Sequence, residues 1–211
     1  MITQFNDAIR QFMGLFRQAP PLPMRLLVPG IIMVPAFVVM ALWLGPENEA
    51  EAFVTAFVIG LALRVALRLE GMVRRLLASF SARQTLAMMV PLALGPLALL
   101  VWIDDPLLCQ RMQSLYFVVL GAMFLSDVIA NRTDMAALFW PWEPMTRYLP
   151  GLSRMMVLYH LAFLLLNETL IRVLLPAGWL VFWAVLPVIS HMILSALIAT
   201  VVAAEDDAAR N

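Results

Sequence analysis

The chain has 211 residues, of which 63% are hydrophobic and 13% charged, with a mean hydropathy of +0.89. Soluble domains are nearer half apolar and a quarter charged, so this composition indicates a protein of the lipid bilayer. The 14 basic residues are all arginines and are balanced by 14 acidic ones, which argues against a nucleic-acid-binding protein. Because Cys109 is the only cysteine, an internal disulfide and a cysteine cluster for metal or redox chemistry are excluded.

Residues 1–20 predict an amphipathic interfacial helix. Its apolar side chains recur at helical spacing, its charged side chains fall on the other side, and Pro20 and Pro21 end it. Such a helix is too polar to span a bilayer and is typical of segments that lie in the headgroup layer. A helix packed on a partner protein is the alternative. The residues expected to face the membrane are Phe5, Ile9, Phe12 and Phe16.

Residues 21–211 predict a single transmembrane domain. A spanning helix needs roughly 20 mostly apolar residues. Six stretches meet or approach this length, near residues 26–44, 52–69, 86–103, 115–130, 155–175 and 179–203. The fourth is short and contains Asp127, so five spans are the alternative. The expected fold class is all-α, a polytopic membrane helical bundle with six or five transmembrane helices.

Arginine placement predicts the orientation, because short cytoplasmic loops collect positive charge. Arginines gather in the N-terminal segment and in the second and fourth connections, whereas the first and third connections are acidic. The N-terminus is therefore expected in the cytoplasm. Four arginines at the second connection are expected to bind anionic lipid headgroups: Arg64, Arg68, Arg74 and Arg75.

Three polar residues interrupt the fifth apolar stretch: Asn167, Glu168 and Arg172. Glu168 and Arg172 are four residues apart, so their side chains share one helix face, and a paired carboxylate is tolerable in a bilayer where a lone one is costly. Asn167 is expected to hydrogen-bond to a neighbouring helix. An intramembrane ionisable residue also marks a functional site by default. The alternatives are a structural clasp, which we favour, and a proton or substrate site.

Other candidates for chemistry are weaker. His160 and His191 have no further carboxylate or cysteine spaced to complete a metal site, so no metal is expected. Asp127 is expected to pair with Arg64 or Arg68 across the bundle. No nucleophile elbow, phosphate loop or Ser-His-Asp set occurs, so no catalytic residue and no cofactor are expected.

Three stretches carry a family pattern by their order and spacing: "LALLVWIDDPLLCQRMQSLYFVVLGAMF", "LSRMMVLYHLAFLLLNETLIR" and "GWLVFWAVLPVIS". Together they resemble the intracellular septation protein A family of bacterial inner-membrane proteins. The positions that match the recurring residues of the family are Asp104, Asp105, Arg111, Asn167, Glu168, Arg172, Trp179 and Phe182. The chain departs from the family at Cys109 and Trp183, where lysines are usual.

The resemblance implies a role in envelope and septum maintenance without an established reaction. We therefore expect a non-enzymatic protein that binds membrane lipids and other integral membrane proteins, and no nucleic acid. One alternative is an accessory or assembly subunit of a large bioenergetic complex, respiratory or photosynthetic, which the aromatic-rich segment 139–144 and the interfacial helix favour. A small transporter or lipid-handling protein that uses Glu168 and Asp127 is a further alternative.

Overall fold

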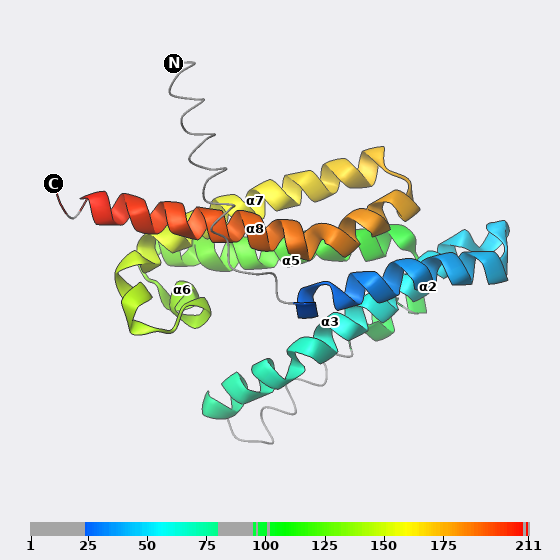
Figure 1. The fold of residues 1–211 in the computed structure, drawn as a ribbon, viewed down its shortest axis with the longest axis horizontal. Helices are drawn as coiled ribbons and strands as arrows, with labels where there is room; N and C mark the ends of the chain where they lie inside the picture. The colour runs from blue at the N-terminus through cyan, green and yellow to red at the C-terminus, as the bar shows by residue number, and fades with distance from the viewer. Residues whose placement is uncertain (1–23, 80–94, 96, 101, 209, 211) are drawn as a thin grey trace, which may run out of the picture. The chain divides into compact units, whose positions relative to one another are not determined.

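The structure is a computed structural model that describes residues 24–79, 95, 97–100, 102–208 and 210. Within these residues all regular structure is helical, which confirms the predicted all-α class (Figure 1). The elements are η1 (Met24–Leu26), α2 (Val28–Leu44), η2 (Pro46–Asn48), α3 (Glu49–Ser79), α5 (Pro106–Ile129), α6 (Asp134–Phe139), η3 (Glu143–Tyr148), α7 (Leu149–Val173) and α8 (Pro176–Ala208). The predicted interfacial helix of residues 1–20, with Phe5, Ile9, Phe12 and Phe16, and most of the predicted third span lie outside the described residues.

Among the described residues, four helical segments are long and apolar enough to cross a membrane: Pro46–Leu67, Pro106–Ile129, Glu143–Val173 and Pro176–Asp207. Helix α2 is apolar but has only 17 residues. The prediction of a membrane-embedded helical protein is thus confirmed, and the count of six spans is not confirmed. The helices also extend beyond the predicted spans, because hydropathy marks only the apolar part of a helix whose backbone hydrogen bonds continue past it. Helix α3, for example, runs on through Arg74 and Arg75, which were expected in a connection.

Local backbone chemistry explains several of the helix ends. Gly45 ends α2 with a φ of 86°, a left-handed conformation that a residue with a side chain rarely adopts. The Asp105 carboxylate accepts a 2.8 Å hydrogen bond from the Leu107 amide and so caps the start of α5. Pro176 opens α8, where its missing N–H costs no helical hydrogen bond.

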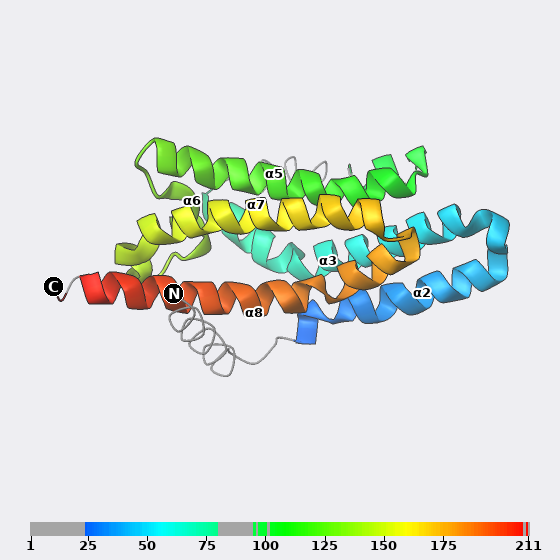
Figure 2. The ribbon, with the colours of Figure 1, turned by 90° about the horizontal axis from the view of Figure 1, so that it is seen from above.

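The chain divides into two compact units, and each is described by itself. The first, here the α2–α3 unit, comprises the described parts of Pro23–Arg111 and Leu170–Pro187. Helices α2 and α3 form a hairpin (Figures 1 and 2). Met33 packs closely on Gly60, because a Cβ added to Gly60 would lie 2.7 Å from the Met33 sulfur. The start of α8 contributes large buried rings to this unit, and the aromatic core consists of Phe53, Phe57, Trp179 and Trp183.

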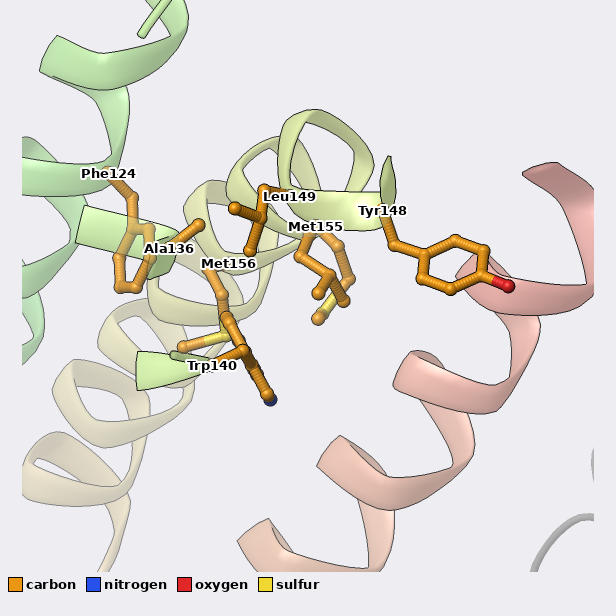
Figure 3. Close-up of a cluster of buried hydrophobic side chains, with 8 residues drawn as sticks. Phe124, Ala136, Trp140, Tyr148, Leu149, Met155 and Met156 are labelled. Atoms are coloured by element: carbon orange, nitrogen blue, oxygen red, sulfur yellow. The ribbon is translucent and has the colours of Figure 1, made fainter. Parts of the chain in front are cut away.

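The second, here the α5–α7 unit, comprises the described parts of Met112–Thr169 and Val188–Asn211. Helices α5 and α7 run antiparallel and side by side (Figure 2). They approach closely at Gly121, where an added Cβ would lie 3.2 Å from the His160 Cβ. The connection between them folds into α6 and η3 and shares one buried cluster with both helices, drawn in Figure 3: Phe124, Ala136, Trp140, Tyr148, Leu149, Leu152, Met155 and Met156.

Candidate functional site

Arg64 lies on α3, inside the apolar stretch Pro46–Leu67, and its guanidinium reaches α8 within the α2–α3 unit. Its Nη2 donates a 2.7 Å hydrogen bond to the backbone oxygen of Trp183. The guanidinium carbon also lies 3.2 Å from the centre of the Trp183 ring, a cation–π contact. Arg64 therefore binds both the backbone and the side chain of one residue of α8.

The sequence of α8 explains why this carbonyl takes an outside donor. In an α-helix the Trp183 oxygen would accept from the N–H of the residue four positions later, which is Pro187. Proline has no N–H, and in a bilayer a freed carbonyl must be satisfied by a neighbouring group because no water is at hand. Arg64 supplies the donor that Pro187 removes.

Arg64 thus makes a contact between helices that the sequence did not predict, and its expected lipid-headgroup role stays a prediction. The side chain turns toward α8 because a backbone oxygen and an aromatic face are within its reach there, and both attract a guanidinium. The side chains of Arg68, Arg74 and Arg75 lie outside what the structure describes, so their lipid role stays a prediction.

A second polar site joins α5 and α7 in the α5–α7 unit. The Asn167 side-chain amide donates a 2.9 Å hydrogen bond to the Ser114 hydroxyl, which in turn donates a 2.6 Å bond to Oε1 of Glu168. Ser114 and Asn167 are buried and Glu168 is half-buried. A serine hydroxyl has one donor and two acceptor positions, so Ser114 can link the amide to the carboxylate in one chain of hydrogen bonds.

The predicted clasp therefore differs from the observed arrangement. The structure brings Asn167 and Glu168 together around Ser114 rather than around Arg172. Arg172 is exposed one residue before the end of α7, and the ion pairs found among the described residues, Arg132–Asp134 and Arg147–Asp206, do not include it. Ser114 was not among the predicted site residues, because the predicted fourth span begins one residue after it. The available signal was a serine next to Gln113 in the first turns of α5.

Asp127 accepts hydrogen bonds from the backbone of the connection that follows α5, and its expected pairing with Arg64 or Arg68 stays a prediction. Its carboxylate, only 2% exposed, accepts a 2.7 Å hydrogen bond from the Met135 amide, and its backbone oxygen accepts one of 2.9 Å from the Arg132 amide. The first turn of α6 leaves its N–H groups without helical partners, and a carboxylate from α5 is well suited to receive one. Asp127 thus ties α6 to the end of α5.

His160 is held among aromatic rings. Its Nδ1 lies 2.7 Å from the Met156 backbone oxygen, and its ring stacks on Phe124 at 5.7 Å. His191 lies on α8 and is half-buried. Over the part of the chain that the structure describes, no group of three or more His, Cys, Asp or Glu side chains is placed to hold a metal ion.

The family-like positions separate by exposure. The charged ones outside the hydrogen-bonded network are exposed: Asp104, Asp105, Arg111 and Arg172. Trp179 is buried in the aromatic core and Phe182 is half-buried. The arrangement can hold helices together in lipid through satisfied polar contacts, and it leaves charge available at helix ends. Comparison with known proteins finds no match to this chain among protein-family models, curated proteins or solved structures.

Proposed function

We propose that the chain is a non-enzymatic, multi-pass membrane protein that acts by binding other integral membrane proteins and lipid. The observation that carries this proposal is how its polar groups are used. Arg64, Ser114, Asp127, Asn167 and Glu168 each make a hydrogen bond that connects two elements of the fold. Side chains committed to packing in this way are typical of a scaffold, whereas a transport or catalytic site keeps groups open to its substrate.

The exposed charges supply a surface that a partner can recognise. Helix α5 runs antiparallel to α7, so the start of α5 and the end of α7 lie at the same end of this pair. Asp104 and Asp105 precede α5, Arg111 follows in its second turn, and Arg172 stands near the end of α7, all exposed. Charges of both signs at a membrane boundary favour a specific partner, because complementary charge fixes orientation and rejects wrong partners.

Two kinds of partner are proposed, one from the family resemblance and one from the alternative function. Under the resemblance to the septation protein A family, the partners belong to division and envelope maintenance. The rival is a respiratory or photosynthetic complex to which the chain adds as an accessory subunit, and the interfacial helix predicted for residues 1–20 favours it.

The proposal is tested by capture in mild detergent followed by quantitative mass spectrometry. We compare the parent chain with Arg111→Glu combined with Arg172→Glu, and with the control Arg132→Glu, an exposed arginine on a different connection. Integral membrane proteins that are retained by the parent and the control and lost from the double variant support the proposal. Equal capture by all three chains would contradict a role of this charged surface, and the proteins identified distinguish a division machinery from a bioenergetic complex.

The orientation is part of the same proposal: the inner membrane, with the N-terminus in the cytoplasm. In a Cys109→Ser background, a cysteine at Asn48 should react with an impermeant reagent from outside and one at Ser81 should not. Reaction at Ser81 with protection of Asn48 would reverse the orientation.

A further inference from the structure

The connection between α5 and α7, residues 130–148, turns back beside the end of α5. Asp127 holds it through the Met135 and Arg132 amides. The Phe139 ring then lies 5.4 Å from the ring of Phe124, a residue about 7.5 Å inside the end of α5 at a rise of 1.5 Å per residue. Figure 3 shows Ala136 beside Phe124, and Trp140 belongs to the same buried cluster. The connection thus lies at the depth of the last turns of α5 and does not project away from them.

The far end of the connection is fixed to α8. Both Arg147 Nη2 and the Tyr148 hydroxyl donate to Oδ1 of Asp206, at 2.5 Å and 2.8 Å. Figure 3 shows the Tyr148 side chain extending toward α8. Asp206 follows the apolar part of α8 and so marks the polar boundary of the bilayer, because a charged side chain is costly further inside. The connection is therefore held between this boundary and the depth of Phe124.

Its exposed side chains include large apolar ones beside the charged side chains of Arg132, Asp134, Glu143 and Arg147. Leu138 is 54% exposed, Trp142 53% and Phe139 39%, and Ile129 at the end of α5 is 75% exposed. Contact with acyl chains is favourable for large apolar side chains at this depth. It lowers the free energy by roughly 25 cal/mol for each Å² of apolar surface removed from water. A tryptophan ring prefers the boundary itself, because it has an apolar body and one N–H donor.

The backbone is also suited to a less polar layer. Pro141 and Pro144 carry no N–H, the Trp140 amide donates to the Ala136 oxygen at 2.8 Å, and the Met145 amide donates to the Trp142 oxygen at 3.0 Å. Irregular backbone is costly near hydrocarbon chiefly because its polar groups lose water. Most backbone amides of this irregular stretch therefore need no hydrogen bond to water.

We propose that residues 130–148 are an interfacial element that binds the phospholipid bilayer, in the leaflet where α5 ends. Leu138, Phe139 and Trp142 lie at the boundary between headgroups and acyl chains, and Asp134 on the first turn of α6 faces water. This inference rests on the membrane-embedded fold and does not depend on the proposed partner binding.

The test measures depth in phosphatidylcholine–phosphatidylglycerol vesicles at a high ratio of lipid to protein. In a Cys109→Ser background, a nitroxide is attached to a cysteine at Leu138 or at Trp142. Asp134 serves as the water reference and Leu165, 60% exposed on α7, as the acyl-chain reference. Collision with oxygen, which concentrates in the acyl chains, is compared with collision with a water-soluble nickel chelate.

At Leu138 and Trp142 the oxygen-to-nickel ratio should be several-fold above that at Asp134 and below that at Leu165. A ratio equal to that at Asp134 would overturn the proposal by placing the connection in water, and one equal to that at Leu165 would place it in the acyl core. Low collision with both reagents would show that protein covers the surface, which also overturns it. Helix content by circular dichroism verifies folding, and either position alone decides the outcome because both side chains are exposed.

Discussion

Arg64 in the α2–α3 unit and Glu168 in the α5–α7 unit are both charged side chains within apolar helices, and the two units accommodate them differently. Arg64 donates to a backbone oxygen whose usual helical donor is replaced by Pro187. Glu168 accepts from the Ser114 hydroxyl, which the Asn167 amide supports. In the α2–α3 unit the charged side chain donates a hydrogen bond to the backbone. In the α5–α7 unit neutral side chains form hydrogen bonds that hold the charged side chain.

The difference predicts an order of energetic importance. Loss of the arginine leaves a carbonyl of α8 without this donor and removes a cation–π contact, and each of these costs free energy in a water-poor site. Loss of the serine removes two side-chain bonds in a bilayer, where such bonds are worth on the order of 1 kcal/mol or less each. Removal of Arg64 should therefore destabilise the fold more than removal of Ser114.

The largest effect is expected for Arg64→Met, which should lower the free energy of unfolding by about 2–3 kcal/mol. Unfolding in mild detergent can be followed by the reaction of Cys109 with a thiol-reactive fluorophore, since this only cysteine is fully buried. Pro187→Ala restores an N–H opposite the Trp183 oxygen, so the double variant Arg64→Met, Pro187→Ala should recover part of the loss. Strictly additive effects of the two changes would show that the arginine does not serve this carbonyl.

The next effect is expected for Ser114→Ala, at about 1.5 kcal/mol, because both Asn167 and Glu168 lose their shared partner. Glu168→Gln keeps an acceptor at Oε1 and should cost less, measured in the same assay. Arg172→Gln should cost least of the three, since Arg172 is exposed.

These three variants also distinguish the clasp that the sequence predicts from the network. A loss for Arg172→Gln as large as that for Ser114→Ala, relieved in Glu168→Gln combined with Arg172→Gln, would establish the ion pair within the membrane. If Glu168→Gln abolishes the function of the protein in cells while its abundance and stability are unchanged, the carboxylate is instead a proton or substrate site.

Variants of Asp127 test whether a carboxylate that accepts a backbone hydrogen bond stabilises the fold, as Arg64 is expected to do. Asp127→Ala should cost about 1 kcal/mol, because the Met135 amide loses its acceptor. Asp127→Asn retains an acceptor oxygen and should recover much of this. Equal losses for both variants would mean that the charge, rather than the hydrogen bond, holds α6 against α5.

The smallest effect sets the baseline for the comparison. Leu165 is 60% exposed on α7, and Leu165→Ala should change the free energy of unfolding by less than about 0.5 kcal/mol, because the side chain packs on little of the fold. A loss as large as that for Ser114→Ala would mean that this face is covered by a partner or a second copy, and native mass spectrometry would identify which.

Apolar composition was enough to predict a helical membrane protein, and local residue chemistry marks three of its helix ends. Composition and apolar runs were sufficient, because the bilayer requires long apolar helices irrespective of how they pack. Gly45, Asp105 and Pro176 stand at helix ends because local backbone chemistry acts over a few residues. Helix lengths were underestimated, since the polar ends of α3 and α5 continue a helix that hydropathy no longer marks.

The groups that the polar side chains contact depend instead on how the helices pack. The prediction paired charges along one helix or across the bundle, but Arg64 contacts a carbonyl on α8, Glu168 a hydroxyl on α5, and Asp127 an amide of α6. Partners of this kind are backbone groups or neutral side chains far away in sequence, and no charge or spacing marks them. Whether a carbonyl lacks its helical donor, and which cation is within reach, depends on how three-dimensional packing brings two helices together.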